Sequence, residues 1–332
     1  MTAMTELLEY NYDDIEGFGD LLASQKPFVL RGLVNNWPLC KAGSSSLDEL
    51  AEYLLLHAEA RKFVTHIGDY SEARHIGYTD GMKMNFRTEE LSLKAVLERI
   101  KQSNAGTSDE LVYVSSVEIK KYFRHLESEN KLDLGGREAR VGIWIGSQNT
   151  VPTHFDFPDN LACVAVGQRK FTLFPPEQLV NLYPGPLDNT PAGRAISLVD
   201  LESPDLDAYP NFEEAQRASV SVELEPGDAI YIPSMWWHSV KALSDYNVLV
   251  NYWWRDDAFS GEPDAALFHA ILSIRDLPDH KKRIWEKMFS HYVFDFDAGA
   301  FDYIQEDARG ILGPMTPKLA SRIKHFLRHV IN

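Results

Sequence analysis

The chain has 332 residues, 44% of them hydrophobic, and its 33 Lys plus Arg against 49 Asp plus Glu give a formal net charge of −16. A negative field of this size repels phosphate backbones, so we expect no nucleic-acid partner. Two cysteines make no disulfide framework, the acidic N-terminus lacks the pattern of a secretory signal, and no run is apolar enough to span a membrane. These features predict a cytoplasmic globular protein.

Residues 1–110 combine strand and helix signals, and we expect an α/β region that packs on the core that follows. The segment "KPFVLRGLV" predicts a strand that ends at the turn "NNWP". The segments "SLDELAEYLLLHAEA" and "SLKAVLERIKQS" each begin with a capping serine and carry apolar residues at helical spacing, which predicts two helices.

Residues 111–258 carry many short strand signals separated by Gly, Pro, Asn and Asp, which is typical of an antiparallel barrel or jelly roll. The segment "AVGQRK" predicts a tight hairpin with Gly167 and Gln168 at its tip, because glycine supplies the positive φ of a two-residue turn. Residues 177–218 interrupt the strands with Pro, Asp and Asn, and we expect this surface excursion to shape the entrance to a site.

Residues 259–332 predict helices with wide apolar faces, in "KKRIWEKMFSHYVF" and "TPKLASRIKHFLRHVI". In the second segment, Thr316 is a candidate cap and Pro317 takes the first helical position. Such a face could pack on the protein's own core or on a second subunit, and both interpretations stay open at this point. The apolar face of the last helix is expected to contain Leu319, Ile323, Phe326, Leu327, Val330 and Ile331.

An imidazole and a carboxylate stand two residues apart in "VPTHFDFPDN", between two strand signals. On an extended segment, His154 and Asp156 project from the same face. An unpaired buried carboxylate costs several kcal/mol, and a divalent metal would satisfy both side chains. His238 lies in an apolar aromatic setting in "YIPSMWWHSVKAL" and is the candidate third ligand. Two histidines and one carboxylate form the facial triad of non-heme Fe(II) oxygenases. Histidines in helix-like segments, such as His57 and His280, are interpreted as ordinary residues.

Several motifs in order resemble the cupin-like branch of the JmjC oxygenases, including its asparaginyl hydroxylases. They are "PFVLRGLVNNWP", "THFD", "DNLACVAVGQRKFTLFPPEQL", "NLYPGPLD", "LEPGDAIYIPSMWWHSV" and "VLVNYWW", and they extend over residues 26–255. The resemblance implies a mostly β fold with helices: a double-stranded β-helix of the cupin or jelly-roll type at 111–258, a mixed N-terminal region and a C-terminal helical extension. It also implies Fe(II) held by His154, Asp156 and His238, 2-oxoglutarate as co-substrate, and a homodimer formed through the C-terminal helices.

Four further positions match residues that surround the co-substrate in this family. Asn160 matches an asparagine that contacts the co-substrate, and Asn251 in "VNYWW" matches a second asparagine near the iron. Tyr113 in "LVYVSS" stands where the family has a tyrosine that reaches the far carboxylate of 2-oxoglutarate. Trp253 matches an aromatic wall of the pocket.

Two positions depart from the family pattern. The co-substrate lysine of the family aligns with Arg169, and a lysine appears one position later as Lys170. Arginine can hold a carboxylate through two parallel hydrogen bonds, and strand alternation allows only one of the two side chains to point inward. Pairing around the expected hairpin places Arg169 on the face of Asn160, so we favour Arg169. Val151 stands where the family has a co-substrate threonine, which weakens the prediction of 2-oxoglutarate but not that of the triad.

The sequence therefore predicts an Fe(II)- and 2-oxoglutarate-dependent oxygenase, a hydroxylase of a protein side chain or a small molecule. Two alternatives stay open: a metal-dependent cupin enzyme that does not use 2-oxoglutarate, and a non-catalytic binding protein of the same fold. A cation at Arg169 or Lys170 together with Tyr113 favours the 2-oxoglutarate-dependent oxygenase, because these side chains could bind the far carboxylate of 2-oxoglutarate. The intact triad argues against a binding protein, which would be expected to lose a ligand.

Overall fold

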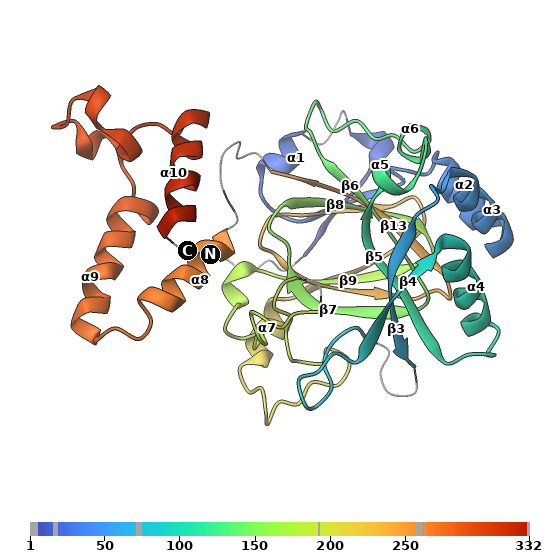
Figure 1. Cartoon of the computed structure of the whole chain (residues 1–332). Coiled ribbons are helices and arrows are strands. Elements are labelled where there is room, and N and C mark those ends of the chain that lie inside the picture. The colour runs from blue at the N-terminus through green and yellow to red at the C-terminus, as the bar shows by residue number, and fades with distance from the viewer. Residues whose placement is uncertain are drawn as a thin grey trace. The chain divides into compact units, whose positions relative to one another are not determined.

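The computed structural model describes residues 6–15, 19–70, 75–191, 193–255, 261 and 263–330 (Figure 1). The chain divides into two compact units, Met1–Arg255 and Asp256–Asn332. The boundary predicted between residues 258 and 259 lies outside the described residues. Within the described ranges, no helix is both long and apolar enough to cross a bilayer.

The first unit is built on two sheets that share one apolar layer. The large sheet has nine strands in the order β1 (Leu8–Asn11), β2 (Phe28–Arg31), β11 (Ala229–Ile232), β8 (Asp159–Val166), β13 (Asn247–Trp254), β6 (Arg140–Gly146), β5 (Glu110–Glu118), β3 (Lys62–Asp69) and β4 (Phe86–Ser92). The small sheet has four strands in the order β10 (Val220–Leu224), β9 (Arg169–Phe174), β12 (Trp237–Ala242) and β7 (Asn149–Phe155). In the described part of the chain, the two sheets do not close into a barrel. This is the mostly β architecture of a double-stranded β-helix that the motifs predicted.

Strand alternation gives each sheet an inner face, toward the other sheet, and an outer face. The shared layer between the sheets, called the interior below, is mainly aliphatic. Its residues include Ala162, Val164, Ile230, Ile232 and Leu249 from the large sheet and Phe171, Leu173, Val220, Val222, Leu224 and Val240 from the small sheet.

Helices cover the outer face of the large sheet (Figure 1). The two helices predicted from their capping serines are present, since Ser46 accepts a hydrogen bond from Glu49 N and Ser92 accepts one from Ala95 N. The helices of this unit are α1 (Gly19–Ala23), α2 (Pro38–Ser45), α3 (Leu47–His57), α4 (Leu93–Asn104), α5 (Ile119–Tyr122), α6 (Leu126–Glu129) and α7 (Phe212–Ala218), with short 3-10 turns at Tyr12–Asp14 and Pro176–Gln178. Strand β5 begins at Glu110 and so runs across the predicted boundary between residues 110 and 111. It pairs with both β3 and β6, so the N-terminal region contributes strands to the large sheet.

The predicted hairpin at Gly167 and Gln168 is wrong. Gly167 does have a positive φ of +75°, but β8 and β9 belong to different sheets and do not pair. Both edges of β8 are already occupied, by β11 and β13, so β9 finds no free edge there. The chain therefore crosses between the sheets at this glycine, where a Cβ atom would lie 2.5 Å from Asn247 Oδ1.

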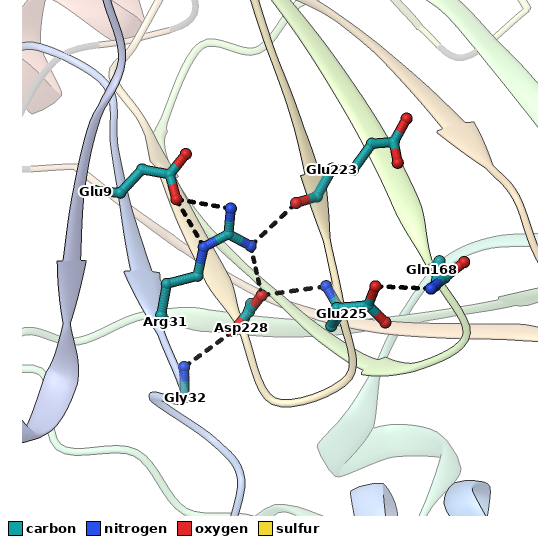
Figure 2. A network of polar contacts seen from close by, with 7 residues as sticks. All are labelled: Glu9, Arg31, Gly32, Gln168, Glu223, Glu225 and Asp228. Carbon is teal, nitrogen blue, oxygen red and sulfur yellow. Dashed lines mark hydrogen bonds and ion pairs between the residues drawn. The ribbon is translucent and has the colours of Figure 1, made fainter.

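A polar network joins β2 to the turn between β10 and β11 (Figure 2). The carboxylate of Asp228, only 10% exposed, accepts hydrogen bonds from Arg31 Nη1 at 2.6 Å, Gly32 N at 2.9 Å and Glu225 N at 3.1 Å. Arg31 also forms an ion pair with Glu9 of β1 at 2.7 Å. One carboxylate thus fixes the edge of the large sheet to the tight turn that leads into β11.

The second unit contains α8 (Pro263–Ser273), α9 (Asp279–Phe289) and α10 (Pro317–Val330), a π-helical turn at Ser290–Phe294, and 3-10 turns at Ala298–Phe301, Glu306–Ala308 and Gly310–Leu312. The predicted start of α10 is confirmed, because Thr316 Oγ1 accepts a hydrogen bond from Leu319 N and Pro317 is the first helical residue. Of the predicted apolar face, Ile331 lies outside the described residues. Among those described, only Phe301 and Ala320 of this unit are buried hydrophobic residues.

We predict that Asp228→Ala lowers the free energy of unfolding by about 2–3 kcal/mol, because it leaves two backbone N–H groups and one side of Arg31 without an acceptor. Equilibrium urea denaturation followed by tryptophan fluorescence measures this loss. The matched control is Glu9→Ala at the exposed end of the network, which should cost less than about 1 kcal/mol. Equal losses in the two variants would contradict this account of the network.

Candidate metal centre and interior pocket

Three side chains converge on the inner face of the small sheet. His154 lies near the end of β7, Asp156 follows the strand, and His238 of β12 pairs directly with His154 across the two strands. The two imidazole centroids are 4.4 Å apart, and His238 Nε2 lies 3.7 Å from Asp156 Oδ2. One possible ligand atom from each residue lies within 4.8 Å of the others. The structure thus brings together the three residues predicted from the sequence as metal ligands.

Backbone carbonyl groups orient both imidazoles. His154 Nδ1 lies 2.8 Å from Pro152 O, and His238 Nδ1 lies 3.0 Å from Trp236 O. A carbonyl oxygen can only accept, so Nδ1 carries the proton in each ring and Nε2 keeps a free lone pair. Burial, together with the neighbouring His154, lowers the pKa of His238 to about 4, although Asp156 acts in the opposite direction. His238 is therefore neutral near pH 7, the form that binds a metal.

The inner face of the large sheet presents a polar and aromatic surface that contains four of the predicted co-substrate residues. Trp144 Nε1 donates to Asn251 Oδ1 at 2.8 Å, and Asn251 Nδ2 lies 3.5 Å from Asn160 Oδ1. Trp144 stacks on Tyr113 with ring centroids 6.0 Å apart and meets Trp253 edge-on at 5.9 Å. Tyr113, Asn160, Asn251 and Trp253 therefore belong to one connected surface of the interior.

Trp144 is the central residue of this surface, and the sequence analysis missed it. The signal was available in "GIWIG", where period-2 alternation puts Gly142, Trp144 and Gly146 on one face. A Cβ atom at Gly142 would lie 2.6 Å from Asn251 Oδ1, and one at Gly146 would lie 3.2 Å from Tyr113 Cδ2. The flanking glycines thus leave the room that the polar residues occupy.

Arg169 and Lys170 point to opposite faces of β9, as alternation requires. Arg169 is 3% exposed and pairs in register with Leu224 and Ala242, on the inner face. Lys170 pairs in register with Lys241 on the outer face, so the structure separates it from the other predicted co-substrate residues. The side chain of Lys170 lines a different cavity, together with Lys241.

The guanidinium of Arg169 is enclosed without a carboxylate partner. Its Nε has no hydrogen-bond acceptor, and no carboxylate of the described residues lies within 4.0 Å. Burial lowers the pKa of Arg169 to about 10, while Tyr113 raises it, so the group is still a cation at pH 7. Burial raises the pKa of Tyr113, Arg169 lowers it and Asp156 raises it, which places the phenol within electrostatic reach of both charged groups.

The spacing between the cation and the triad suits a short dicarboxylate. On β12 and β9, His238 pairs with Leu173, four residues from Arg169. At about 3.3 Å per residue these positions are ~13 Å apart along the strand. An arginine side chain and a five-carbon dicarboxylate together can fill a gap of this order. Val151, which stands where the family has a threonine, packs in the cluster of Tyr113 and contributes no hydroxyl group there.

The residues present fit the groups that the resemblance implies. Two imidazoles and one carboxylate are a donor set for Fe(II) that leaves further coordination positions open. A buried guanidinium without a carboxylate of its own suits the far end of 2-oxoglutarate. This agreement rests on side chains of β7, β9 and β12 and of Asp156, which follows β7.

A sequence profile described as the cupin-like domain matches residues 16–259, most of the chain. The chain belongs to the cupin-like domain family. Its predicted resemblance to the cupin-like branch of the JmjC oxygenases is thereby confirmed at the level of the family.

Curated relatives of this cupin-like protein carry several different names. The chain is 27% identical to lysine-specific demethylase 8 of Xenopus tropicalis over 264 residues, which cover 75% of this chain and 53% of that protein. It is 35% identical to lysine-specific demethylase JMJ31 of Arabidopsis thaliana over 127 residues, which cover 38% of this chain and 23% of that protein. It is 38% identical to tRNA wybutosine-synthesizing protein 5 of Danio rerio over 103 residues, which cover 31% of this chain and 28% of that protein. The chain thus spans about half or less of the length of these relatives.

Among solved structures, the Escherichia coli ribosomal oxygenase YcfD is similar to this chain. The two share 17% sequence identity with a TM-score of 0.43, over 98% of this chain and 69% of that one.

We predict that Fe(II), added under argon, raises the melting temperature of the first unit and that a chelator reverses the rise. A ligand at ~100 times its Kd adds about 2.7 kcal/mol to the folded state, which corresponds to several degrees. His154→Ala should abolish the metal-induced shift, measured by differential scanning calorimetry. The control His280→Ala, at an exposed histidine of α9, should keep it. An unchanged metal-induced shift in His154→Ala would contradict the assignment of this centre.

Proposed function

We propose that the protein is an Fe(II)- and 2-oxoglutarate-dependent oxygenase that hydroxylates a C–H bond of a protein side chain or a small molecule. The observation that carries the proposal is the buried, carboxylate-free Arg169 on the same inner face as the triad. Membership of the cupin-like family and the names of its demethylase relatives support the class of reaction. The net charge of −16 supports a substrate other than nucleic acid.

His154, Asp156 and His238 would hold the Fe(II) ion from the side of the small sheet. The contacts of the two histidine Nδ1 atoms with backbone carbonyl groups fix the orientations of the rings before any metal binds, so metal binding requires little reorganisation. When bound, Fe(II) would supply the activation of dioxygen: one oxygen atom would go to 2-oxoglutarate, which would lose carbon dioxide to become succinate, and the other would be inserted into the C–H bond.

Arg169 and Tyr113 would bind the far carboxylate of 2-oxoglutarate, through charge-assisted and phenolic hydrogen bonds respectively. Asn251 is held by Trp144 and contacts Asn160, so the two asparagines would line the co-substrate site together. Val151 and the aliphatic residues of the interior exclude water from the reaction site. The protein thus contributes orientation and a dry pocket, and the cofactor supplies the reactivity.

We predict that anaerobic addition of Fe(II) and then 2-oxoglutarate produces the weak visible charge-transfer band of the metal chelate. His154→Ala should remove the band because the metal is lost. Arg169→Met should weaken the binding of 2-oxoglutarate by at least about tenfold, since a charge-assisted hydrogen bond contributes ~1.5–3 kcal/mol. A titration of the band with 2-oxoglutarate measures both effects.

The matched control is Lys170→Met, which removes a cation from the next residue of the same strand but from the outer face. It should leave the titration unchanged. Bound iron without any band would favour the alternative of a cupin enzyme that does not use 2-oxoglutarate. Loss of binding in Lys170→Met but not in Arg169→Met would contradict the proposed role of Arg169.

We also propose that a second copy of the chain covers the apolar faces of the C-terminal unit. Several large apolar side chains of its helices and turns are strongly exposed, among them Leu272 at 81% and Phe294 at 78%. A unit of this size with so small a core is not expected to be stable alone. In a two-fold dimer, one self-complementary contact would cover these faces on both copies.

The prediction is a dimer in solution, at twice the chain mass of 37.7 kDa, by light scattering coupled to size-exclusion chromatography. The double variant Leu272→Glu with Phe294→Glu should elute as a monomer, because charges on both copies cannot be buried in the contact. A wild-type protein that is monomeric at micromolar concentration would contradict the proposal.

A further inference from the structure

A cavity lies on the outer face of the small sheet, and we call it the outer cavity. Its volume is about 560 Å³, within the range of small-molecule sites. Outward-facing residues of β7, β9, β10 and β12 form its floor, and residues 75–82, residues 196–202 and α7 cover it. None of the three metal-ligand candidates lines it, so it is separate from the interior pocket.

Two lysines lie side by side on the floor of the outer cavity. Lys170 and Lys241 are directly opposite each other on β9 and β12 and project from the same face. Like charges in this arrangement repel and destabilise a sheet unless they are compensated. Lys241 is compensated, because its Nζ lies 2.5 Å from Glu202 Oε2 of the covering segment.

Lys170 has no such partner. The residue is half-buried, and no carboxylate of the described residues lies within 4.0 Å of its Nζ. Its cross-strand neighbour on the other side is Glu223 of β10, an exposed residue that forms no ion pair with it. The remaining carboxylates of the cavity, Asp80 and Asp200, are exposed. Lys170 is thus the cavity lysine that forms no ion pair with a described residue, in a lining that also contains the carboxylates of Asp80, Asp200 and Glu202.

A buried hydroxyl group without a partner lines the same cavity. Thr153 is 1% exposed, and its Oγ1 makes no hydrogen bond. Other hydroxyl groups of the floor are satisfied within the protein, since Thr172 pairs with Ser221 at 2.9 Å and Ser239 donates to Val151 O at 3.0 Å. A buried polar atom without a partner is costly, and a bound ligand would remove that cost.

We infer that the outer cavity is a binding site for a small organic anion, a carboxylate or a phosphate ester, with Lys170 as its cation. Thr153 Oγ1, which has almost no accessible surface, would donate a second hydrogen bond to the ligand only after its side chain rotates. The aromatic walls provided by Tyr209 and Phe212 accommodate its apolar body. The inference does not depend on the proposed oxygenase activity, because it rests on different residues and on the opposite face of the sheet.

The test measures the binding of two probes to the full chain: 4-fluorobenzoate by fluorine NMR line broadening and inorganic phosphate by phosphorus NMR. At least one probe should bind saturably to the wild type, and Lys170→Met should weaken that binding by about tenfold or more. Thr153→Val should weaken it by a smaller factor. Arg169→Met removes the cation of the interior pocket and should leave the binding unchanged.

Three results would overturn the inference. The first is that neither probe binds saturably at concentrations on the order of 10 mM. The second is that Lys170→Met binds the probe as tightly as the wild type. The third is that Arg169→Met loses the binding, which would locate the probe in the interior. Far-UV circular dichroism and the thermal melting curve verify that Lys170→Met is folded. A failed oxygenase proposal would leave the probe results unchanged, so the two failures are distinguishable.

Discussion

The energetic constraint on this fold is the burial of ionisable groups between two apolar sheets. Arg169 is 3% exposed and has no carboxylate partner among the described residues, and the carboxylate of Asp156, 20% exposed, lies beside two imidazoles. Unpaired buried charges cost several kcal/mol each, so the interior is most stable when something fills it. A metal ion at one end and a dicarboxylate at the other would satisfy both demands. Ligand binding and the stability of the first unit are therefore expected to be linked.

Strand alternation lets the small sheet carry two chemically distinct faces. Arg169 and Lys170 are sequence neighbours, yet one is enclosed in the interior and the other lines the outer cavity. His238 and Ser239 of β12 are divided in the same way. A shift of one residue in register would exchange these faces and destroy both. The Asp228 network helps to hold the edge of the facing sheet in place.

The sequence was sufficient to predict those features that depend on short-range periodicity and motif order. The convergence of His154, Asp156 and His238 and the inward direction of Arg169 follow from period-2 alternation on identified strands. The inward direction of Arg169 was nevertheless inferred from a hairpin between β8 and β9 that does not form. Both edges of β8 are occupied by β11 and β13, which are distant from it in the sequence. The outer cavity was not predicted either, since it forms only where residues 75–82 and 196–202 fold over one sheet. Such long-range contacts leave no local pattern.

The most direct test of the central claim is a crystal structure of the protein grown anaerobically with Fe(II) and an inert analogue of 2-oxoglutarate. Anomalous scattering at the iron edge locates the metal directly. The account predicts iron bound by His154 Nε2, His238 Nε2 and a carboxylate oxygen of Asp156, with the far carboxylate of the analogue on Arg169. Iron at another position, or an analogue bound away from Arg169, would contradict the account.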